Sequence, residues 1–259
     1  MNLFNLKNKT IIIVGAGRGL GFELSNYLFK QGAKIIGIDQ KFNSSNFSKK
    51  IIVDLKKITS LKKKIEIVTN KLKVIDGLVF CAGITKPNKK FNSYDSLKFN
   101  EVFRVNLQSA YIINYIVANH MLKKKIKGSI INFTSIGAHQ AFPENPYYTS
   151  SKSALRHLTK SFAYDYGPKN IRFNNIVPGY FKTPMNKKTL RSQKKITERS
   201  KRNLLLRWGN PLEICGGVHF LLSDASSYVT ATDLVIDGGS PDSTAGSGRS
   251  DRLRLYRHA

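Results

Sequence analysis

The chain is poor in cysteine and has no long apolar run. Its 259 residues include two cysteines, Cys81 and Cys215, which lie far apart in apolar surroundings. This usage excludes a disulfide framework and indicates buried thiols in a reducing compartment, so we expect a cytoplasmic protein. No stretch approaches the roughly 20 apolar residues that cross a bilayer, and residues 1–7 do not form an apolar signal core. The sequence therefore predicts neither export nor a membrane partner.

Acidic residues are also scarce, and this gives the chain a strong positive charge. It has 16 Asp and Glu against 43 Lys and Arg, a formal net charge of +27. Clustered basic residues neutralise nucleic-acid phosphates, but here the lysines are scattered through every predicted element and no nucleic-acid motif or aromatic-interleaved basic stripe is present. We therefore expect solvated lysine faces and no nucleic-acid partner. The five histidines have no metal-ligand spacing, so we predict no metal site.

Short apolar runs alternate with segments of helical periodicity along most of the chain. A length of 259 residues suits one α/β domain. Such alternation predicts a parallel sheet with helices on both faces. The expected strands are residues 10–14, 33–38, 50–53, 74–80, 129–133, 171–177 and 234–237. The expected helices are residues 20–31, 60–72, 96–122, 145–166 and 211–223.

A glycine-rich turn, Gly15-Ala-Gly-Arg-Gly-Leu-Gly21, separates the first strand from the first helix. Glycine allows the backbone to approach a pyrophosphate closely, and the free N–H groups at the start of a helix bind it. By itself the pattern is equally compatible with a structural turn. Asp39 ends the second strand, 18 residues after Gly21, where a carboxylate accepts hydrogen bonds from the adenosine ribose.

Two sets of charges point to different dinucleotides. The carboxylate of Asp39 would repel a 2′-phosphate, which favours NAD. Arg18 and Lys41 favour NADP, because a guanidinium or ammonium group binds that phosphate. Giving more weight to the carboxylate, we predict NAD and keep NADP as the alternative.

Tyr148 lies 13 residues after Ser135 and begins the segment Tyr148-Thr-Ser-Ser-Lys152. A tyrosine and a lysine four residues apart lie on one face of a helix. The ammonium favours the phenolate and so lowers a phenol pKa that is ordinarily near 10. Tyr148 then becomes usable as a general acid and base.

These motifs, in this order and followed by Pro178-Gly179, resemble the short-chain dehydrogenase/reductase family from about Leu6 to Gly239. The resemblance implies a Rossmann-like, doubly wound, mostly seven-stranded parallel sheet with helices on both faces, in one catalytic domain of residues 1–240. The chain departs from the family pattern at Val14, where threonine is usual. It also departs at Phe80 and Cys81, which replace two asparagines before Ala82-Gly83 and put part of a polar strand-end network in doubt.

The resemblance assigns a catalytic tetrad of Asn106, Ser135, Tyr148 and Lys152. Tyr148 would transfer the proton, Ser135 would hydrogen-bond the substrate oxygen, Lys152 would also hold the nicotinamide ribose, and Asn106 would bind a water of a proton relay. The expected cofactor-binding residues are Gly15, Arg18, Gly19, Leu20, Gly21, Asp39, Asp54, Leu55, Ala82, Gly83, Tyr148, Lys152, Pro178, Gly179 and Thr183. The candidate substrate residues are His139, Gln140, Phe142 and Tyr180.

In this family, the segment after Pro178-Gly179 forms a lid over the substrate, here residues 180–208. It contains nine basic residues between Lys182 and Arg202 against one acid, Glu198. We expect an anionic small-molecule substrate, such as a sugar phosphate, a nucleotide-linked sugar or an acyl thioester; the alternative is a solvated helix in a lysine-rich protein.

The first functional prediction is an NAD-dependent oxidoreductase that interconverts a secondary alcohol of a sugar-like compound and its ketone. The alternatives are an NADPH-dependent 3-oxoacyl-(carrier protein) reductase and a non-catalytic nucleotide-sensing scaffold. The family resemblance also implies a homotetramer or homodimer formed through the long helices.

Residues 241–259 differ from the rest of the chain, with four arginines and no lysine. We interpret this tail as disordered and foreign to the protein, either vector-derived or read from a shifted frame, and assign it no function. The alternative is a native flexible tail that reaches a neighbouring subunit.

Overall fold

The computed structural model describes residues 2–43, 47–87 and 94–240, so the tail of residues 241–259 lies outside the described residues. The described chain forms a seven-stranded sheet of order β3-β2-β1-β4-β5-β6-β7, in which neighbouring strands are parallel. The strands are β1 (Thr10–Val14), β2 (Lys34–Asp39), β3 (Lys49–Ile52), β4 (Gly77–Phe80), β5 (Ser129–Phe133), β6 (Arg172–Pro178) and β7 (Asp233–Ile236). The predicted fold class, a doubly wound parallel sheet, is confirmed.

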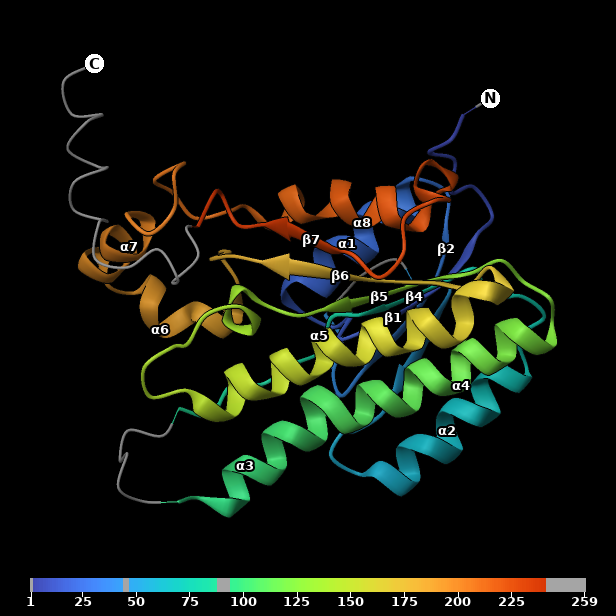
Figure 1. Cartoon of the computed structure of the whole chain (residues 1–259), viewed down its shortest axis with the longest axis horizontal. Helices are drawn as coiled ribbons and strands as arrows, with labels where there is room; N and C mark the ends of the chain where they lie inside the picture. Colours follow the sequence, from blue (N-terminus) through green and yellow to red (C-terminus); the bar gives the residue numbers. More distant parts are fainter. Residues whose placement is uncertain (1, 44–46, 88–93, 241–259) are drawn as a thin grey trace.

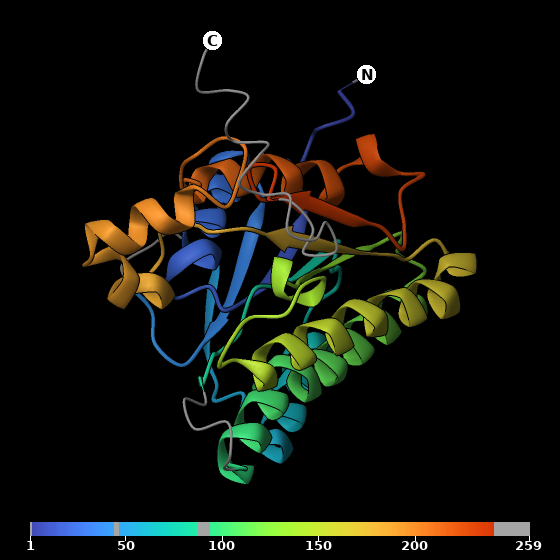
Figure 2. The same ribbon diagram turned by 60° about the vertical axis from the view of Figure 1, so that its left-hand side comes forward.

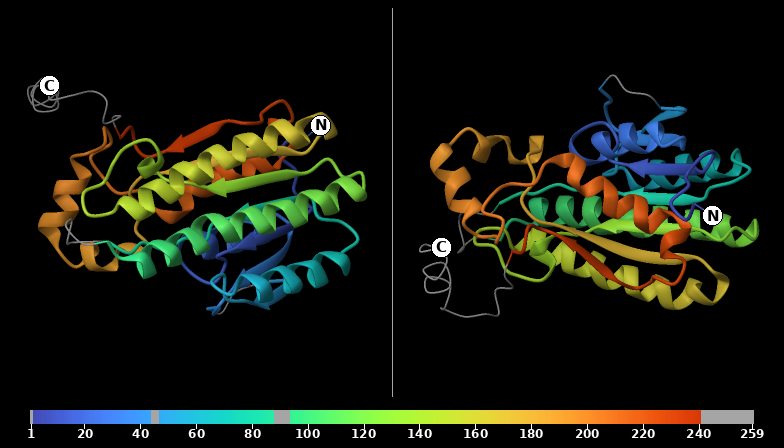
Figure 3. Two further views of the ribbon diagram at one scale, coloured as in Figure 1. Left: turned by 60° about the horizontal axis from the view of Figure 1, so that its bottom comes forward. Right: turned by 90° about the horizontal axis from the view of Figure 1, so that it is seen from above.

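The strands consist largely of apolar residues because helices cover the sheet on both sides. β5 is buried at every position, and β1 at all but its first. In Figure 1, α1 (Gly19–Lys30) and α8 (Cys215–Leu222) lie above the sheet, while α2 (Ile58–Asn70), α4 (Ser109–Lys123) and α5 (Pro146–Tyr166) lie below it. Figures 2 and 3 show the same layers from other directions.

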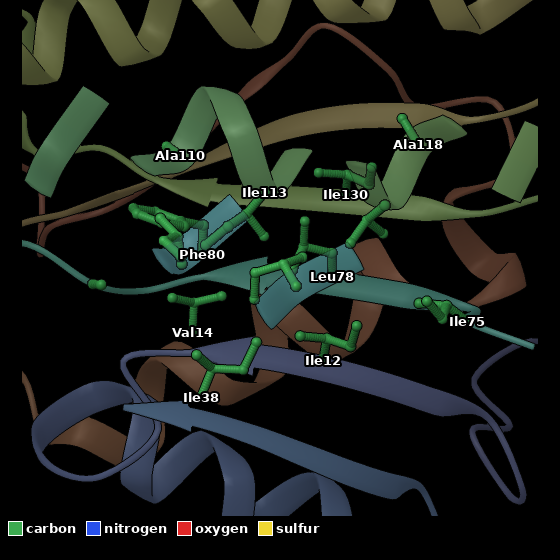
Figure 4. Close-up of a cluster of buried hydrophobic side chains, with 14 of the residues drawn as sticks. Ile12, Val14, Ile38, Ile75, Leu78, Phe80, Ala110, Ile113, Ala118 and Ile130 are labelled. Carbon is green, nitrogen blue, oxygen red and sulfur yellow. The ribbon is translucent and has the colours of Figure 1, made fainter. Parts of the chain in front are cut away.

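Each face of the sheet has its own apolar core. The core beneath α2, α4 and α5 is shown in Figure 4, where Val14, Leu78 and Phe80 from the strands face Ala110 and Ile113 of α4. Phe80 is fully buried. The apolar residue at this position therefore contributes packing where the family pattern has an amide.

The helix predicted for residues 96–122 is present and contains one π-helical turn. α3 (Ser96–Phe103) ends in a π-helical segment, Arg104–Gln108, and α4 begins at Ser109. A π-helical turn contains an extra residue per turn and is frequent at functional sites. It falls on Asn106, whose side chain is fully buried. The sequence therefore predicted the extent of the helix within one residue, and it did not predict the π-helical turn at Asn106.

The strand order defines where a ligand binds. β2 and β4 flank β1 on opposite sides, so the connections leaving β1 and β4 turn to opposite sides and open a crevice at the carboxyl ends of the strands. The helices of the predicted lid segment, α6 (Lys187–Leu190) and α7 (Gln193–Ser200), lie at the end of the molecule to which β6 and β7 point (Figure 1).

The two ends of the lid pair with each other. Phe181 bridges to Gly209, the Lys182 N–H donates to the Gly209 carbonyl at 3.1 Å, and the Gly209 N–H donates to the Tyr180 carbonyl at 2.9 Å.

Across the described ranges, none of the helices combines the length and apolar character needed to cross a bilayer.

Candidate active site

A cleft of about 460 Å³ opens at the carboxyl ends of β1, β2 and β4. The lining residues come from the glycine turn, the ends of β2 and β4, and the first residues of the lid. Ten of the predicted cofactor-binding residues line it, namely Gly15, Arg18, Gly19, Leu20, Gly21, Asp39, Leu55, Ala82, Gly83 and Thr183. Segments far apart in the sequence therefore converge on one site.

The glycine turn packs too closely to admit side chains at several positions. A Cβ on Gly15, whose φ is +84°, would lie 2.8 Å from the Ala82 nitrogen, and one on Gly21 would collide with the Gly15 carbonyl. No side chain caps the first turn of α1 at Arg18, whereas Asp95 caps α3 by accepting from the Lys98 N–H at 2.9 Å. The uncapped N–H groups of α1 suit a phosphate, so the turn fits the pyrophosphate of a dinucleotide.

Asp39 is held at the cleft by backbone donors. Its carboxylate accepts hydrogen bonds from Gly17 N at 2.8 Å and Gln40 N at 2.7 Å. The Gln40 side chain in turn donates to Asp54 at 2.7 Å. Asp54 is thus engaged behind the cleft wall, while its neighbour Leu55 lines the cleft. The Asp39 oxygens are oriented without any contribution from a ligand.

Lys152 is buried, with 3 % of its surface exposed, and its Nζ donates to the Phe133 carbonyl at 2.7 Å. Burial lowers the pKa of Lys152 from 10.5 to about 8. The ammonium lies 6.0 Å from the centroid of the Tyr148 ring. A Cβ on Gly83 would lie 3.2 Å from Lys152 Nζ and 3.5 Å from Asn106 Oδ1. The structure therefore brings Lys152, Asn106 and the cleft wall together.

The pKa of Tyr148 moves in the direction opposite to the expected one. Burial raises it, and the hydrogen bond with the Ser135 hydroxyl opposes that rise. The expectation that Lys152 lowers the tyrosine pKa is not met in the ligand-free protein, because removal of water from the phenol has the larger effect. Burial thus favours the protonated form of the Tyr148 phenol. Its neighbour Tyr147 turns to α3, where its hydroxyl accepts from Asp95 N at 3.2 Å.

Asn106 joins two walls of the site through its side-chain amide. Its Oδ1 accepts from Ile84 N at 2.8 Å, and its Nδ2 donates to Ile84 O at 3.0 Å and to Ser151 Oγ at 2.9 Å. The fully buried Ser151 hydroxyl donates to the Tyr148 carbonyl at 2.8 Å. A chain of hydrogen bonds therefore runs from the cleft loop to α5, the helix that carries Tyr148. The sequence analysis did not single out Ser151 or Ile84, although Ser151 lies three residues after Tyr148 on the same helical face.

The amide network that Phe80 and Cys81 put in doubt is supplied in part by Asn106. Its two bonds to Ile84 hold the backbone just after Ala82-Gly83. Cys81 lines the cleft, and burial raises its pKa strongly, so its thiol stays protonated. No group of three or more His, Cys, Asp or Glu side chains within the described ranges is arranged to hold a metal ion.

The four candidate substrate residues have different surroundings. Phe142 packs on Gly137, whose N–H donates to Ser135 Oγ at 3.0 Å, so it lies beside the predicted reacting centre. The Gln140 N–H donates to Ile136 O at 3.1 Å in the same turn. The Nε2 of His139 instead lies 4.0 Å from Asp233, whose carboxylate also accepts from Arg156.

The tyrosine at the start of the lid, Tyr180, follows Pro178-Gly179 at the end of β6. Its ring centroid lies 5.3 Å from that of Trp208. Phe133 pairs with Ile176 in the sheet, so Ser135 and Pro178 each follow two residues later on neighbouring strands. The Pro178-Gly179 segment and the Ser135 turn are therefore adjacent.

The doubly wound sheet, the glycine turn at its crevice and the buried Tyr148-Lys152 pair define the class of an NAD(P)-dependent oxidoreductase. The chain belongs to the short-chain dehydrogenase/reductase family: a family model described as Enoyl-(Acyl carrier protein) reductase matches residues 15–240.

Relatives cover almost the whole chain. It is 34% identical over 247 residues to 2-dehydro-3-deoxy-D-gluconate 5-dehydrogenase of Bacillus subtilis, a match that covers 91% of this chain and 96% of the relative. A gluconate 5-dehydrogenase from Burkholderia cenocepacia, solved in complex with NADP and tartrate, has a TM-score of 0.84 and 29% identity over 92% of this chain and 96% of its own. A 4-hydroxyisoleucine dehydrogenase complexed with NADH has a TM-score of 0.83 and 31% identity over 93% of this chain and 100% of its own.

Proposed function

We propose that this enzyme is an NAD-dependent dehydrogenase that interconverts a secondary alcohol and a ketone on a sugar acid. The names of the gluconate-type relatives support the substrate class, and the basic lid supports an anion. The observation that carries the NAD preference is the Asp39 carboxylate, held in the cleft by Gly17 N at 2.8 Å. There it would accept hydrogen bonds from the ribose hydroxyls and would repel a 2′-phosphate.

In the proposed reaction, Tyr148 and Ser135 act on the substrate oxygen. The Tyr148 hydroxyl donates its proton to the oxygen of a ketone, or accepts one from an alcohol, while Ser135 hydrogen-bonds the same oxygen and stabilises its charge. The hydride at the substrate carbon would come from, or pass to, the nicotinamide of a bound dinucleotide. Lys152 is fixed by its 2.7 Å bond to the Phe133 carbonyl. It would hold the nicotinamide ribose, and its charge would stabilise the phenolate that forms when the Tyr148 proton leaves. Asn106 fixes the π-helical turn against the cleft loop, where the proposed relay water would bind.

Most of the other assigned cofactor residues would each contact or support one part of the dinucleotide. The glycine turn with Arg18 and Leu20 would contact the pyrophosphate, Asp54 would support the adenine end through Gln40, and Ala82 and Gly83 would allow close backbone approach. Pro178, Gly179 and Thr183 would hold the carboxamide of the nicotinamide. Among the substrate candidates, Phe142, Gln140 and Tyr180 stay our assignments, whereas the His139 side chain lies 4.0 Å from Asp233.

The first test is a fluorescence titration of the full chain with NADH and NADPH. The wild type should bind NADH about tenfold more tightly than NADPH, because the Asp39 carboxylate would repel the 2′-phosphate of NADPH. The Asp39→Asn variant keeps a hydrogen-bond acceptor and removes the charge, so the preference should shrink. Tighter NADPH binding by the wild type would refute the NAD assignment and would make Arg18 and Lys41 the dominant groups.

Turnover then tests the substrate class. We expect NAD reduction with D-gluconate or a deoxygluconate and its loss in Tyr148→Phe. Reduction of a 3-oxoacyl thioester with NADPH, and no reaction with any sugar acid, would instead favour the acyl-reductase alternative.

We also propose a homotetramer or homodimer formed through the long helices. The surface of α4 and α5 supports this: Tyr111 and Tyr115 are 47% and 50% exposed, and a groove of about 690 Å³ lined by Phe103, Leu107 and Leu158 lies between the helices. Apolar surface of this kind is typical of an interface. Light scattering on the wild type and on Leu158→Glu should give an oligomer and a smaller species, respectively. A monomeric wild type would contradict the proposal.

A further inference from the structure

The nine basic residues of the lid are not equivalent. Eight of them are exposed to solvent, and one, Arg199 on α7, is partly buried. The eight exposed side chains fit the solvated face expected in a lysine-rich protein. Arg199 is different, because its guanidinium is fixed against the protein.

Two aromatic rings hold Arg199. Its Cζ lies 5.1 Å from the centroid of the Tyr180 ring and 6.0 Å from that of Trp208. Trp208 is only 3 % exposed, and its Nε1 donates to the carbonyl of Ile196, one turn before Arg199 on the same helix, at 3.2 Å. The ring contacts satisfy the face of the guanidinium. They leave the N–H donors at its edge available to an acceptor.

That acceptor is not supplied by the described residues. No ion pair with a described carboxylate and no hydrogen bond from the guanidinium is found for Arg199 over residues 2–43, 47–87 and 94–240. Arg207 on the same segment shows the contrast, since it binds Glu213 through two hydrogen bonds of 2.8 and 2.6 Å. Arg199 is thus a partly buried cation that pairs with no anion among the described residues.

The rings that hold Arg199 belong to the base of the lid. Tyr180 lies two residues after Pro178, the last residue of β6, and Ser135 lies two residues after the end of the neighbouring β5. At the other side of the base, Thr183 and Pro184 approach the glycine turn, where a Cβ on Gly19 would lie 3.8 and 3.6 Å from them. The first residues of the lid, from Tyr180 to Pro184, therefore extend from the end of β5, near Ser135, to the cofactor cleft.

We propose that Arg199 recognises the carboxylate of the substrate through the two N–H groups at one edge of its guanidinium. This inference rests on the proposed function and names the residue that selects the acid. A planar guanidinium matches a carboxylate in a bidentate pair, and the Tyr180–Trp208 support fixes its plane before the substrate binds. The eight exposed cations attract anions through their electric field, but they do not orient a bound carboxylate.

Direct binding tests the assignment without requiring turnover. The NADH complexes of the wild type, Arg199→Gln and Arg199→Lys are titrated calorimetrically with D-gluconate, tartrate and the uncharged D-glucitol. We expect Arg199→Gln to weaken binding of both acids about tenfold or more, and Arg199→Lys to restore part of the loss, because lysine keeps the charge and lacks the fork. The preference for D-gluconate over D-glucitol should fall with it.

Arg202→Gln is the matched control, since it removes one exposed cation of the same cluster. It should change gluconate binding by less than about twofold, and added salt should abolish that change. Thermal unfolding and NADH affinity of each variant report whether the lid has been damaged.

Three results would overturn the assignment: unchanged gluconate binding in Arg199→Gln, equal weakening of D-gluconate and D-glucitol, or no binding of either acid to the wild-type complex. The proposed function fails differently, by absence of NAD reduction with all polyols and sugar acids while Arg199-dependent binding of acids persists.

Discussion

Replacing the buried Lys152 by methionine should make the protein more stable at neutral pH and change how stability depends on pH. Methionine has a similar length and no charge, so it occupies the same space between α5 and β5. The native ammonium is 3 % exposed and bonded to one carbonyl, that of Phe133. The folded protein therefore holds a cation that water would solvate better.

The size of the effect follows from the pKa. A fall from 10.5 in the unfolded chain to about 8 in the folded protein makes protonation about 3 kcal/mol less favourable on folding. Between pH 8 and 10.5 the unfolded state binds more protons at this lysine, so the stability of the wild type rises with pH across that window. Leaving the Phe133 carbonyl without its donor costs the variant about 1–2 kcal/mol. Lys152→Met should then gain about 1–2 kcal/mol at pH 7 and lose that advantage by pH 10.5.

Urea unfolding of the cofactor-free wild type and variant at intervals from pH 7 to 10.5 measures this difference. Groups that titrate in both proteins cancel, so the difference between the two should decline by about 3 kcal/mol across the window. The exposed Lys195→Met serves as a control and should give a difference that does not depend on pH. A Lys152→Met difference that is also flat would show that the ammonium is not desolvated.

Two further changes address the hydrogen-bond chain and the glycine turn. Ser151→Ala removes the hydroxyl between Asn106 and the Tyr148 carbonyl, so kcat should fall about tenfold with little change in NADH affinity; steady-state kinetics against the exposed Ser150→Ala would show equal kcat values if the hydroxyl positions nothing. Gly21→Ala places a methyl group against the Gly15 carbonyl, so the turn must shift and NADH affinity should fall at least about tenfold in a fluorescence titration; unaltered affinity in a folded variant would contradict a tight turn at the pyrophosphate.

The sheet was the most predictable part of the molecule. Buried parallel strands are continuous runs of Ile, Val and Phe, so residues 10–14 and 129–133 were predicted with the bounds that the structure has. The order of the glycine turn and the tyrosine–lysine pair along the chain then located the crevice.

The local geometry of the candidate site was less predictable. The π-helical turn at Asn106 adds one residue to a helix without any change in apolar pattern that marks it, because its stabilisation comes from the two bonds to Ile84. The direction of the Tyr148 pKa depended on burial, which spacing along a helix does not report. The distinction between Arg199 and its eight basic neighbours likewise rests on two rings, one of them Trp208, that only the fold brings together.

The pairing of Phe181 with Gly209 allows the sequence of the lid to change in evolution independently of the sheet. Because the bridge between Phe181 and Gly209 brings the two ends of this segment together, insertions or exchanges between these residues need not disturb the strand ends that carry Ser135 and Pro178. A lineage can therefore change the acid, sugar or amino-acid derivative that its enzyme accepts by altering one closed segment, while the proton-transfer residues remain under separate selection. Exchanging the lids of two relatives at these paired positions is accordingly the natural way to transfer substrate preference between them.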